Sequence, residues 1–122
     1  TFEYSLQPTI IQANMNLIYI VINNLLSNAV KYSNEGAKIY VSCGEKDGKS
    51  YIRIQDEGCG IEKENISKIF ESFYREKKDR NAEGFGLGLS QAMKIAELYG
   101  GGIYVESTKN KGSIFTFFIP KP

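Results

Sequence analysis

The chain has 122 residues and a formal net charge of +1, with 42% apolar and 24% charged residues. This length supports one hydrophobic core, so we expect a single domain over residues 1–122. The near-neutral charge gives no reason to expect bulk binding to nucleic acid or to an anionic membrane. Any bound anion must therefore be held by a local arrangement of groups.

The cysteine and histidine content limits the chemistry further. Cys43 and Cys59 are the two cysteines, and the chain contains no histidine. Two cysteines do not make a disulfide framework, and a zinc site or a catalytic cysteine would normally use histidine. We expect reduced thiols in the cytosol, with Cys43 as a small core residue.

The first third of the chain predicts a strand and a long helix. Residues 2–7 read as a strand that Pro8 ends. Because the sequence starts in this strand, we expect a fragment of a longer protein, and no apolar run approaches the roughly 20 residues of a membrane span. The helix is capped by Asn14 or Asn16 and runs to about Tyr32. Its apolar residues cover most of its circumference, which indicates a central helix rather than a surface one.

The rest of the chain predicts strands and helices in mixed order. A hairpin turn with an Asp-Gly signal is expected over Glu45-Lys46-Asp47-Gly48, and Gly100-Gly101-Gly102 is expected to end the last helix. The expected elements are strands over 37–43 and 50–55, a short helix over 63–71, a charged loop over 74–83, a helix over 86–99 and strands over 103–107 and 113–119. Without regular β-α-β alternation, the pattern favours an α+β fold over a doubly wound one.

The long helix carries the first candidate site. Asn24, Asn28, Lys31 and Tyr32 fall within about 100° of arc at 3.6 residues per turn. An amide oxygen suits Mg²⁺, an amide NH₂ can donate to phosphate, and Lys31 supplies a positive charge for phosphate. Tyr32 offers a ring that could lie against a base. The alternative is that the asparagines cap or bridge backbone inside a packed helix.

The second candidate is Asp56-Glu57-Gly58-Cys59-Gly60, at the end of a strand. An aspartate there can accept a hydrogen bond from an exocyclic amine such as that of adenine. Gly58 and Gly60 allow backbone to approach a flat ligand closely. The alternative is a plain tight turn.

The third candidate is the segment Gly84-Phe85-Gly86-Leu87-Gly88-Leu89-Ser90. Glycines before a helix leave several N–H groups for a phosphate at the positive end of the helix dipole. The segment lacks the Lys-Ser/Thr pair of a P-loop and the β-α-β setting of a dinucleotide fold. The alternative is a flexible hinge.

The fourth candidate is the pair Arg75 and Arg80 in the charged loop. A guanidinium near a terminal phosphate would stabilise its charge. The alternative is a solvated charged loop.

The order of these motifs resembles the catalytic and ATP-binding domain of sensor histidine kinases, in the gyrase, chaperone, kinase and mismatch-repair ATPase (GHKL, or HATPase_c) superfamily. The resemblance covers essentially all of the chain. The matching segments are Asn24 to Ser33 for the N box, Asp56 to Ile61 for the G1 box, Ile69 to Arg75 for the F box, Gly84 to Ser90 for the G2 box and Gly112 to Pro120 for the last strand.

The resemblance implies a two-layer α/β sandwich of the Bergerat type, with a mixed sheet packed on three helices and ATP held beneath a lid. It implies that Asn24 coordinates Mg²⁺ and that Asn28 and Lys31 contact the phosphates. It also implies that Tyr32 lines the base site and that Asp56 receives the adenine amino group.

The remaining implied site residues surround the nucleotide. Thr116 would reach the adenine pocket, and Arg75 and Arg80 would be lid arginines that share the catalytic role with Asn24 and Lys31. The other implied nucleotide-binding residues are Gly58, Gly60, Ile61, Phe73, Gly84, Gly86, Leu87, Gly88 and Leu89.

Two positions depart from the family pattern. Phe85 stands where a small hydroxyl residue is common, so the packing of the lid could differ. Cys59 is unusual in the G1 box and puts an oxidisable thiol beside the expected base site.

Three functions remain to be distinguished: a kinase domain, a hydrolytic ATPase and a nucleotide-sensing module without chemistry. In the hydrolytic relatives a glutamate acts as general base at the position of Asn24. General-base assistance is worth roughly 10²–10⁴-fold, so an amide there argues against efficient hydrolysis. The residues therefore favour transfer of the γ-phosphate to a histidine.

The resemblance also implies partners and a location. Because the chain has no histidine, the phosphoacceptor would lie in a separate dimerisation domain of the same kinase, N-terminal to Thr1. A response regulator receiver domain would be the next partner. The domain would be cytoplasmic, and the parent would be an integral membrane sensor of the inner or plasma membrane.

Overall fold

The computed structural model describes residues 2–6, 13–33, 36–61, 63–70 and 88–121. The elements are β1 (Phe2–Leu6), α1 (Met15–Tyr32), β2 (Ile39–Lys46), β3 (Lys49–Asp56), the 3₁₀ helix η1 (Lys63–Lys68), α2 (Gly88–Leu98), β4 (Gly102–Thr108) and β5 (Gly112–Pro120). Most boundaries lie within two residues of those expected from the sequence, but β2 continues to Lys46, three residues beyond its expected end and into the expected turn.

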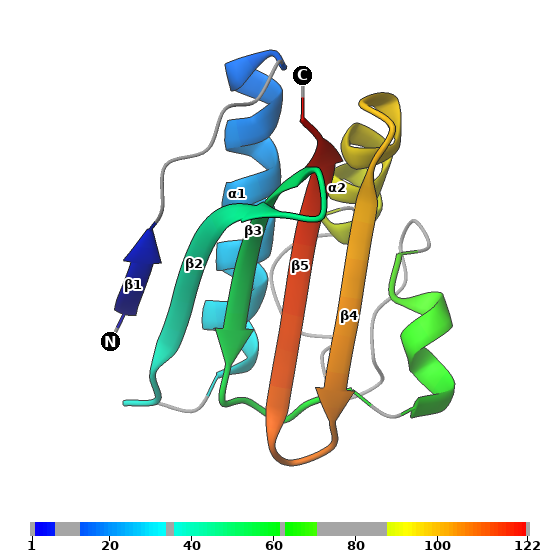
Figure 1. Cartoon of the computed structure of the whole chain (residues 1–122). Coiled ribbons are helices and arrows are strands. Elements are labelled where there is room, and N and C mark those ends of the chain that lie inside the picture. Colours follow the sequence, from blue (N-terminus) through cyan, green and yellow to red (C-terminus); the bar gives the residue numbers. More distant parts are fainter. Residues whose placement is uncertain (1, 7–12, 34–35, 62, 71–87, 122) are drawn as a thin grey trace.

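The strands form one mixed sheet in the order β1-β2-β3-β5-β4. β1 is parallel to β2, and the other neighbouring pairs are antiparallel. Helices α1 and α2 lie side by side on one face, and the other face of the sheet has no helix over it among the described residues (Figure 1). The predicted two-layer α+β sandwich with a mixed sheet is confirmed. Of the three implied helices, the described residues show two α-helices on the sheet, and the third helical segment is the 3₁₀ helix η1, which contacts β4.

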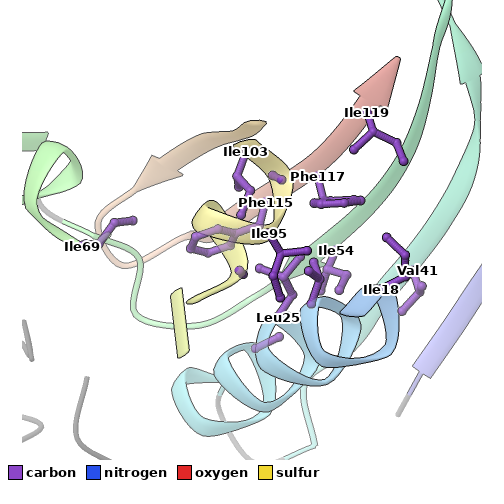
Figure 2. Close-up of a cluster of buried hydrophobic side chains, with 14 of the residues drawn as sticks. Ile18, Leu25, Val41, Ile54, Ile69, Ile95, Ile103, Phe115, Phe117 and Ile119 are labelled. Atoms are coloured by element: carbon purple, nitrogen blue, oxygen red, sulfur yellow. The ribbon is translucent and has the colours of Figure 1, made fainter. Parts of the chain in front are cut away.

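The core lies between the sheet and the two α-helices (Figure 2). Strand β5 shows how alternation builds it. Phe115, Phe117 and Ile119 are each 2% exposed, while Thr116 and Phe118 between them are only partly buried. Successive side chains of a strand point to opposite faces, so the buried residues face the helices and the others face the open side.

Helix α1 begins at a specific cap. The side chain of Asn14 accepts a hydrogen bond from the backbone N–H of Asn16 at 2.8 Å, which satisfies one N–H left over in the first turn. Asn14 is therefore the cap, and Asn16 is already helical. The helix ends at Tyr32 because Ser33 adopts an extended conformation with ψ 150°.

The expectation that α1 is a central helix is wrong. Ile18, Val21 and Leu25 are almost fully buried, but Tyr19 is 66% and Val30 54% exposed. The sheet covers one side of α1 and α2 covers another, and the remaining stripe faces outward. Apolar residues around the whole circumference of a helix therefore do not show that the helix is buried on all sides.

Two smaller expectations also need correction. The segment expected as an α-helix over 63–71 is a 3₁₀ helix over Lys63–Lys68, followed by a turn that buries Ile69. Cys43 is only partly buried. It shares the inward side of β2 with Ile39 and Val41 but lies closer to the hairpin.

Positive backbone φ angles occur at the turns that the sequence predicted. Asp47 and Gly48 have φ values of 53° and 76°, and Lys46 pairs with Lys49 across them. This is the two-residue hairpin favoured by Asp-Gly. At the end of α2, Gly100 has φ 80°, and the N–H of Gly101 donates to the carbonyl of Ala96 at 2.9 Å, as in a Schellman cap.

Candidate functional site

Polar groups from four elements gather at the end of the sheet where β3 stops and β4 turns into β5, the lower end in Figure 1. Ser33, just after α1, forms an isolated β-bridge with Gly58 after β3. The N–H of Asn110 donates to the carbonyl of Cys59 at 2.7 Å, so the β4–β5 turn also contacts this loop. We call residues 57–61 the β3 loop.

Asp56 is the buried carboxylate of this region. It is the last residue of β3, is 4% exposed and shares the inward face with Ile54. Its Oδ1 accepts the N–H of Gly58 at 2.9 Å. Burial raises the pKa of Asp56 above the ordinary aspartate value, and hydrogen bonds from the backbone of Gly58 and Ser113 oppose that rise. The carboxylate is thus fixed in position by these hydrogen bonds, and its oxygens can accept a further one.

Two serines that the sequence reasoning missed lie in this region, Ser113 beside Asp56 and Ser107 beside Ser113. Ser113 pairs directly with Asp56 across β3 and β5 and is buried. Its hydroxyl lies 2.8 Å from that of Ser107, which is its partner on β4. The alternation of β5 could have found Ser113, because it has the same parity as the apolar Phe115 and Phe117.

Thr116, in contrast, does not join Asp56. It is paired with Arg53 on one side and Tyr104 on the other, and both of those side chains are exposed. The ring of Tyr104 also stacks on Phe118 with centroids 4.7 Å apart. Thr116 therefore lies on the open face of the sheet, away from the helices, so it does not contribute to a site around Asp56.

The glycines of the β3 loop serve contacts within the chain. Gly60 has φ 69°, and a Cβ there would lie 2.2 Å from the carbonyl oxygen of Thr108. Next to it, the N–H of Ile61 donates to the Ser107 hydroxyl at 2.7 Å. Gly60 is therefore required for its close packing against the end of strand β4, and this requirement does not depend on a ligand.

The amide of Asn24 has a defined orientation. Its Nδ2 donates to Oε1 of Gln91 on α2 at 3.0 Å. Its Oδ1 faces the first turn of α2, since a Cβ on Gly88 would lie 3.6 Å from that oxygen. Gln91 is another residue that the sequence analysis missed, and only the packing of α1 on α2 shows its contact.

Other predicted residues on the described helices take varied positions. Asn28 is half-buried one turn after Asn24, and Lys31 is exposed in the last turn of α1, which Tyr32 completes. Leu89 packs against the core cluster from the first turn of α2. The predicted site residues Phe73, Arg75, Arg80, Gly84, Gly86 and Leu87 lie outside the described residues.

The site thus has two polar ends on the helix side of the sheet. Asp56 and Ser113 form one end, where hydrogen-bond acceptors are buried. Asn24 and the start of α2 form the other, where backbone N–H groups of the first helical turn favour an anion. A ligand with a polar ring and a phosphate chain matches such a pair of ends.

The family model described as "Histidine kinase-, DNA gyrase B-, and HSP90-like ATPase" matches residues 13–122. The chain belongs to this ATPase family. The resemblance drawn from its motifs is confirmed.

Within that family the chain is similar to sensor histidine kinases. It is 38% identical over 114 residues to the sensor histidine kinase WalK of Bacillus subtilis, covering 90% of the chain and 19% of WalK. The structure of the mycobacterial sensor histidine kinase MprB has a TM-score of 0.90 and 26% identity, covering 98% of the chain and 82% of that structure. Full-length ShkA in complex with AMPPNP has a TM-score of 0.85 and 26% identity, covering 98% of the chain and 25% of ShkA.

The chain corresponds to the ATPase domain of these kinases and spans about a fifth of the length of WalK. In the part of the chain that the structure describes, no helix is long and apolar enough to cross a membrane.

Proposed function

We propose that this domain binds Mg²⁺-ATP and donates the γ-phosphate to a histidine in a separate dimerisation domain of the same kinase. The observation that carries the proposal is the placement of Asn24. Its amide oxygen faces the start of α2, where a phosphate chain would meet the backbone N–H groups of the first helical turn. The AMPPNP bound to the similar kinase ShkA supports a nucleotide as the ligand.

Asp56 would hold the base. Its carboxylate only accepts hydrogen bonds when ionised, and the 6-amino group of adenine offers two N–H donors. Because Asp56 is 4% exposed, water competes poorly for that contact, and a hydrogen bond to a buried charged group is worth roughly 1.5–3 kcal/mol. Gly58 keeps the carboxylate in place through its N–H.

The residues near α2 fit a magnesium ion. The NH₂ of Asn24 is engaged by Gln91, so its oxygen is the atom left to face the phosphate region. An amide oxygen is a hard ligand, and Mg²⁺ commonly takes one or two protein ligands and completes its shell with phosphate oxygens and water. When bound, Mg²⁺ would neutralise charge on the phosphates. Asn28 and Lys31 would contact the phosphates from the same helix.

Phosphate transfer is favoured over hydrolysis by the same residue. Asn24 cannot act as a general base, and such a base is worth roughly 10²–10⁴-fold. Positioning and charge neutralisation remain, and these dominate phosphoryl transfer. In the transfer, the bond between the γ-phosphorus and the bridging oxygen breaks, a bond from a histidine nitrogen to phosphorus forms, and ADP leaves.

The acceptor must come from outside the chain, because its 122 residues include no histidine. A response regulator receiver domain would accept the phosphoryl group next, and we place the domain in the cytoplasm as part of a longer sensor. The alignment with WalK covers 90% of this chain but only 19% of WalK, which is consistent with an acceptor and a sensor outside this domain.

The proposal is tested by mixing the domain with [γ-³²P]ATP, Mg²⁺ and the dimerisation segment of its parent kinase. We expect acid-labile label on that segment, and none on the chain alone. Steady-state hydrolysis by the isolated domain at about 1 s⁻¹ or faster would instead identify a hydrolytic ATPase. ATP binding without transfer to a verified, folded acceptor would identify a nucleotide-sensing module.

A further inference from the structure

Four side chains form a row across the open face of the sheet, the face opposite the helices (Figure 1). Arg53 of β3 pairs with Ser42 of β2 on one side and with Thr116 of β5 on the other. Thr116 pairs in turn with Tyr104 of β4. Directly paired residues of neighbouring strands share a face and have Cβ atoms about 4.5–5.5 Å apart. We call these four residues the polar row, and each of them can donate a hydrogen bond.

Arg53 is the charged member of the polar row. It is exposed, and no acidic side chain pairs with it in the part of the chain that the structure describes. Alternation along the strands places Lys46, Lys49 and Glu106 on the same face, which gives it three cations and one anion. The planar guanidinium offers N–H donors that fit a carboxylate. This face therefore suits a partner that carries carboxylates.

Aromatic residues lie directly beside the polar row. Tyr51 pairs with Phe118 across β3 and β5. The ring of Tyr104 stacks on that of Phe118 with centroids 4.7 Å apart, and the Nζ of Lys49 lies 4.8 Å from the Phe118 centroid. Because β3 and β4 flank β5, Lys49 and Tyr104 approach this ring from opposite sides. Tyr104 is thus held in place while 59% exposed, so a partner would lose little entropy in ordering it.

The stability of the sheet does not account for this whole arrangement. Cross-strand aromatic pairs stabilise a sheet, which explains the stack of Tyr104 on Phe118, but not an exposed arginine without an acidic partner beside it. Arginine and tyrosine are enriched at the energetic centres of protein interfaces. A nucleic acid would instead need a basic groove along several phosphates, whereas this face has three cations and the chain a net charge of +1.

We propose that the open face of the sheet is a docking surface for an acidic segment of another protein. Carboxylates of that segment bind Arg53, and an apolar side chain next to them packs on Tyr104. The surface lies on the other side of the sheet from Asp56, which shares the inward face with Ile54. A partner docked there leaves the nucleotide site accessible, so the inference goes beyond the proposed function and does not depend on it.

The experiment selects peptides from a random library displayed on phage against the wild-type domain, and then measures their dissociation constants as synthetic peptides. We expect the selected peptides to combine Asp or Glu with a neighbouring Phe, Leu or Tyr. Arg53→Ala and Tyr104→Ala should each weaken their binding about tenfold or more. Added salt should weaken it too, because the contact with Arg53 is exposed.

Matched controls lie on the helix layer. Lys94→Ala removes an exposed cation of α2, and Tyr19→Ala removes a ring of α1 that is 66% exposed. Both should keep peptide binding within about twofold of wild type. The affinity for ATP should be the same in Arg53→Ala and Tyr104→Ala as in wild type, since neither side chain lies on the helix side of the sheet.

Selected peptides without acidic residues, or acidic peptides that bind Arg53→Ala and Tyr104→Ala as tightly as wild type, overturn the inference. If Tyr104→Ala does not fold, Arg53→Glu decides: its side chain is exposed, and the inference requires that peptide binding be lost, so wild-type binding there contradicts it. Single-stranded oligothymidylate that binds through Arg53 more tightly than the acidic peptides would also overturn it, in favour of nucleic acid.

Discussion

At the scale of a single residue, the burial of Asp56 disfavours the ionised carboxylate that its proposed role requires. Burial raises its pKa, because a carboxylate loses hydration when the sheet and the helices enclose it. The proposed role needs that same carboxylate ionised and facing a donor. The unliganded domain therefore holds a destabilised charge that an amino group would stabilise.

Asp56→Asn should separate binding from stability. We expect it to weaken ATP binding by about 1.5–3 kcal/mol, the range for a hydrogen bond to a charged group, and isothermal titration would measure this. Because the pKa is raised in the folded state, the wild type loses stability as pH rises through the window above 3.8. Without nucleotide, the Asn variant should lack that loss, so its Tm at pH 7 should equal or exceed that of the wild type. Unchanged ATP affinity would remove Asp56 from the site.

Gln91 provides a second test at this scale. Gln91→Ala releases the NH₂ of Asn24, so the amide can rotate and its oxygen is no longer held toward α2. We expect a loss of about 0.5–1.5 kcal/mol in ATP affinity with Mg²⁺ and no loss in EDTA. The exposed Glu97→Gln near the other end of the same helix is the control. An equal loss in EDTA would contradict an orienting role toward the metal.

The residue scale also shows what the sequence could and could not predict. Asp56 was identified because a strand end and two glycines mark its place in the chain. Thr116 was expected at the same site but lies on the open face, since residues 113 and 116 of one strand differ in parity. The contact of Asn24 with Gln91 joins residues 67 positions apart, and no local pattern encodes it.

At the scale of elements, the contact between the β3 loop and the β4–β5 hairpin builds the buried end of the site. Gly60 approaches Thr108, and a Cβ on Gly112 would lie 2.1 Å from the carbonyl oxygen of Asp56. Two backbone segments therefore pack without side chains between them. This contact lies next to Ser113, which pairs with Asp56 on one side and with Ser107 on the other.

Gly60→Ala should disrupt this contact. The added methyl group meets Thr108 at 2.2 Å, and φ is 69°, so left-handed strain adds roughly 1–2 kcal/mol and overpacking adds roughly 1–3 kcal/mol. Gly48→Ala is the control, with φ 76° and no atom within 4 Å, and it should lose only about 1–2 kcal/mol. Urea denaturation would compare the two, and equal losses would show that the contact with Thr108 is not tight.

Boundaries of the elements were predictable to within a few residues where local chemistry sets them: the cap was expected at Asn14 or Asn16 and is Asn14, and the turn expected over residues 45–48 is confined to Asp47 and Gly48. Which faces of an element are buried was not predictable in the same way. Val30 and Tyr19 are apolar, yet they lie on the outward stripe of α1, because the number of neighbours is set by the assembled layers. The 3₁₀ conformation of η1 was also not evident in a six-residue segment with helical periodicity.

At the scale of the molecule, the sheet and two helices form one layered unit with the polar site at one end (Figure 1). Domain class and motif order were predictable, because each motif is a local pattern of residues in the sequence. The division of the site into a base end and a phosphate end required the fold, because β3, β5 and α2 come together from separate parts of the chain.

The central claim is that this end of the molecule binds Mg²⁺-ATP, and a titration of the isolated domain with ATP, ADP and GTP, with and without Mg²⁺, tests it most directly. The account predicts saturable ATP binding that Mg²⁺ strengthens, clear discrimination against GTP, and loss of that discrimination in Asp56→Asn. Equal affinity for ATP and GTP in the wild type, or no binding of ATP with Mg²⁺ present, would contradict it.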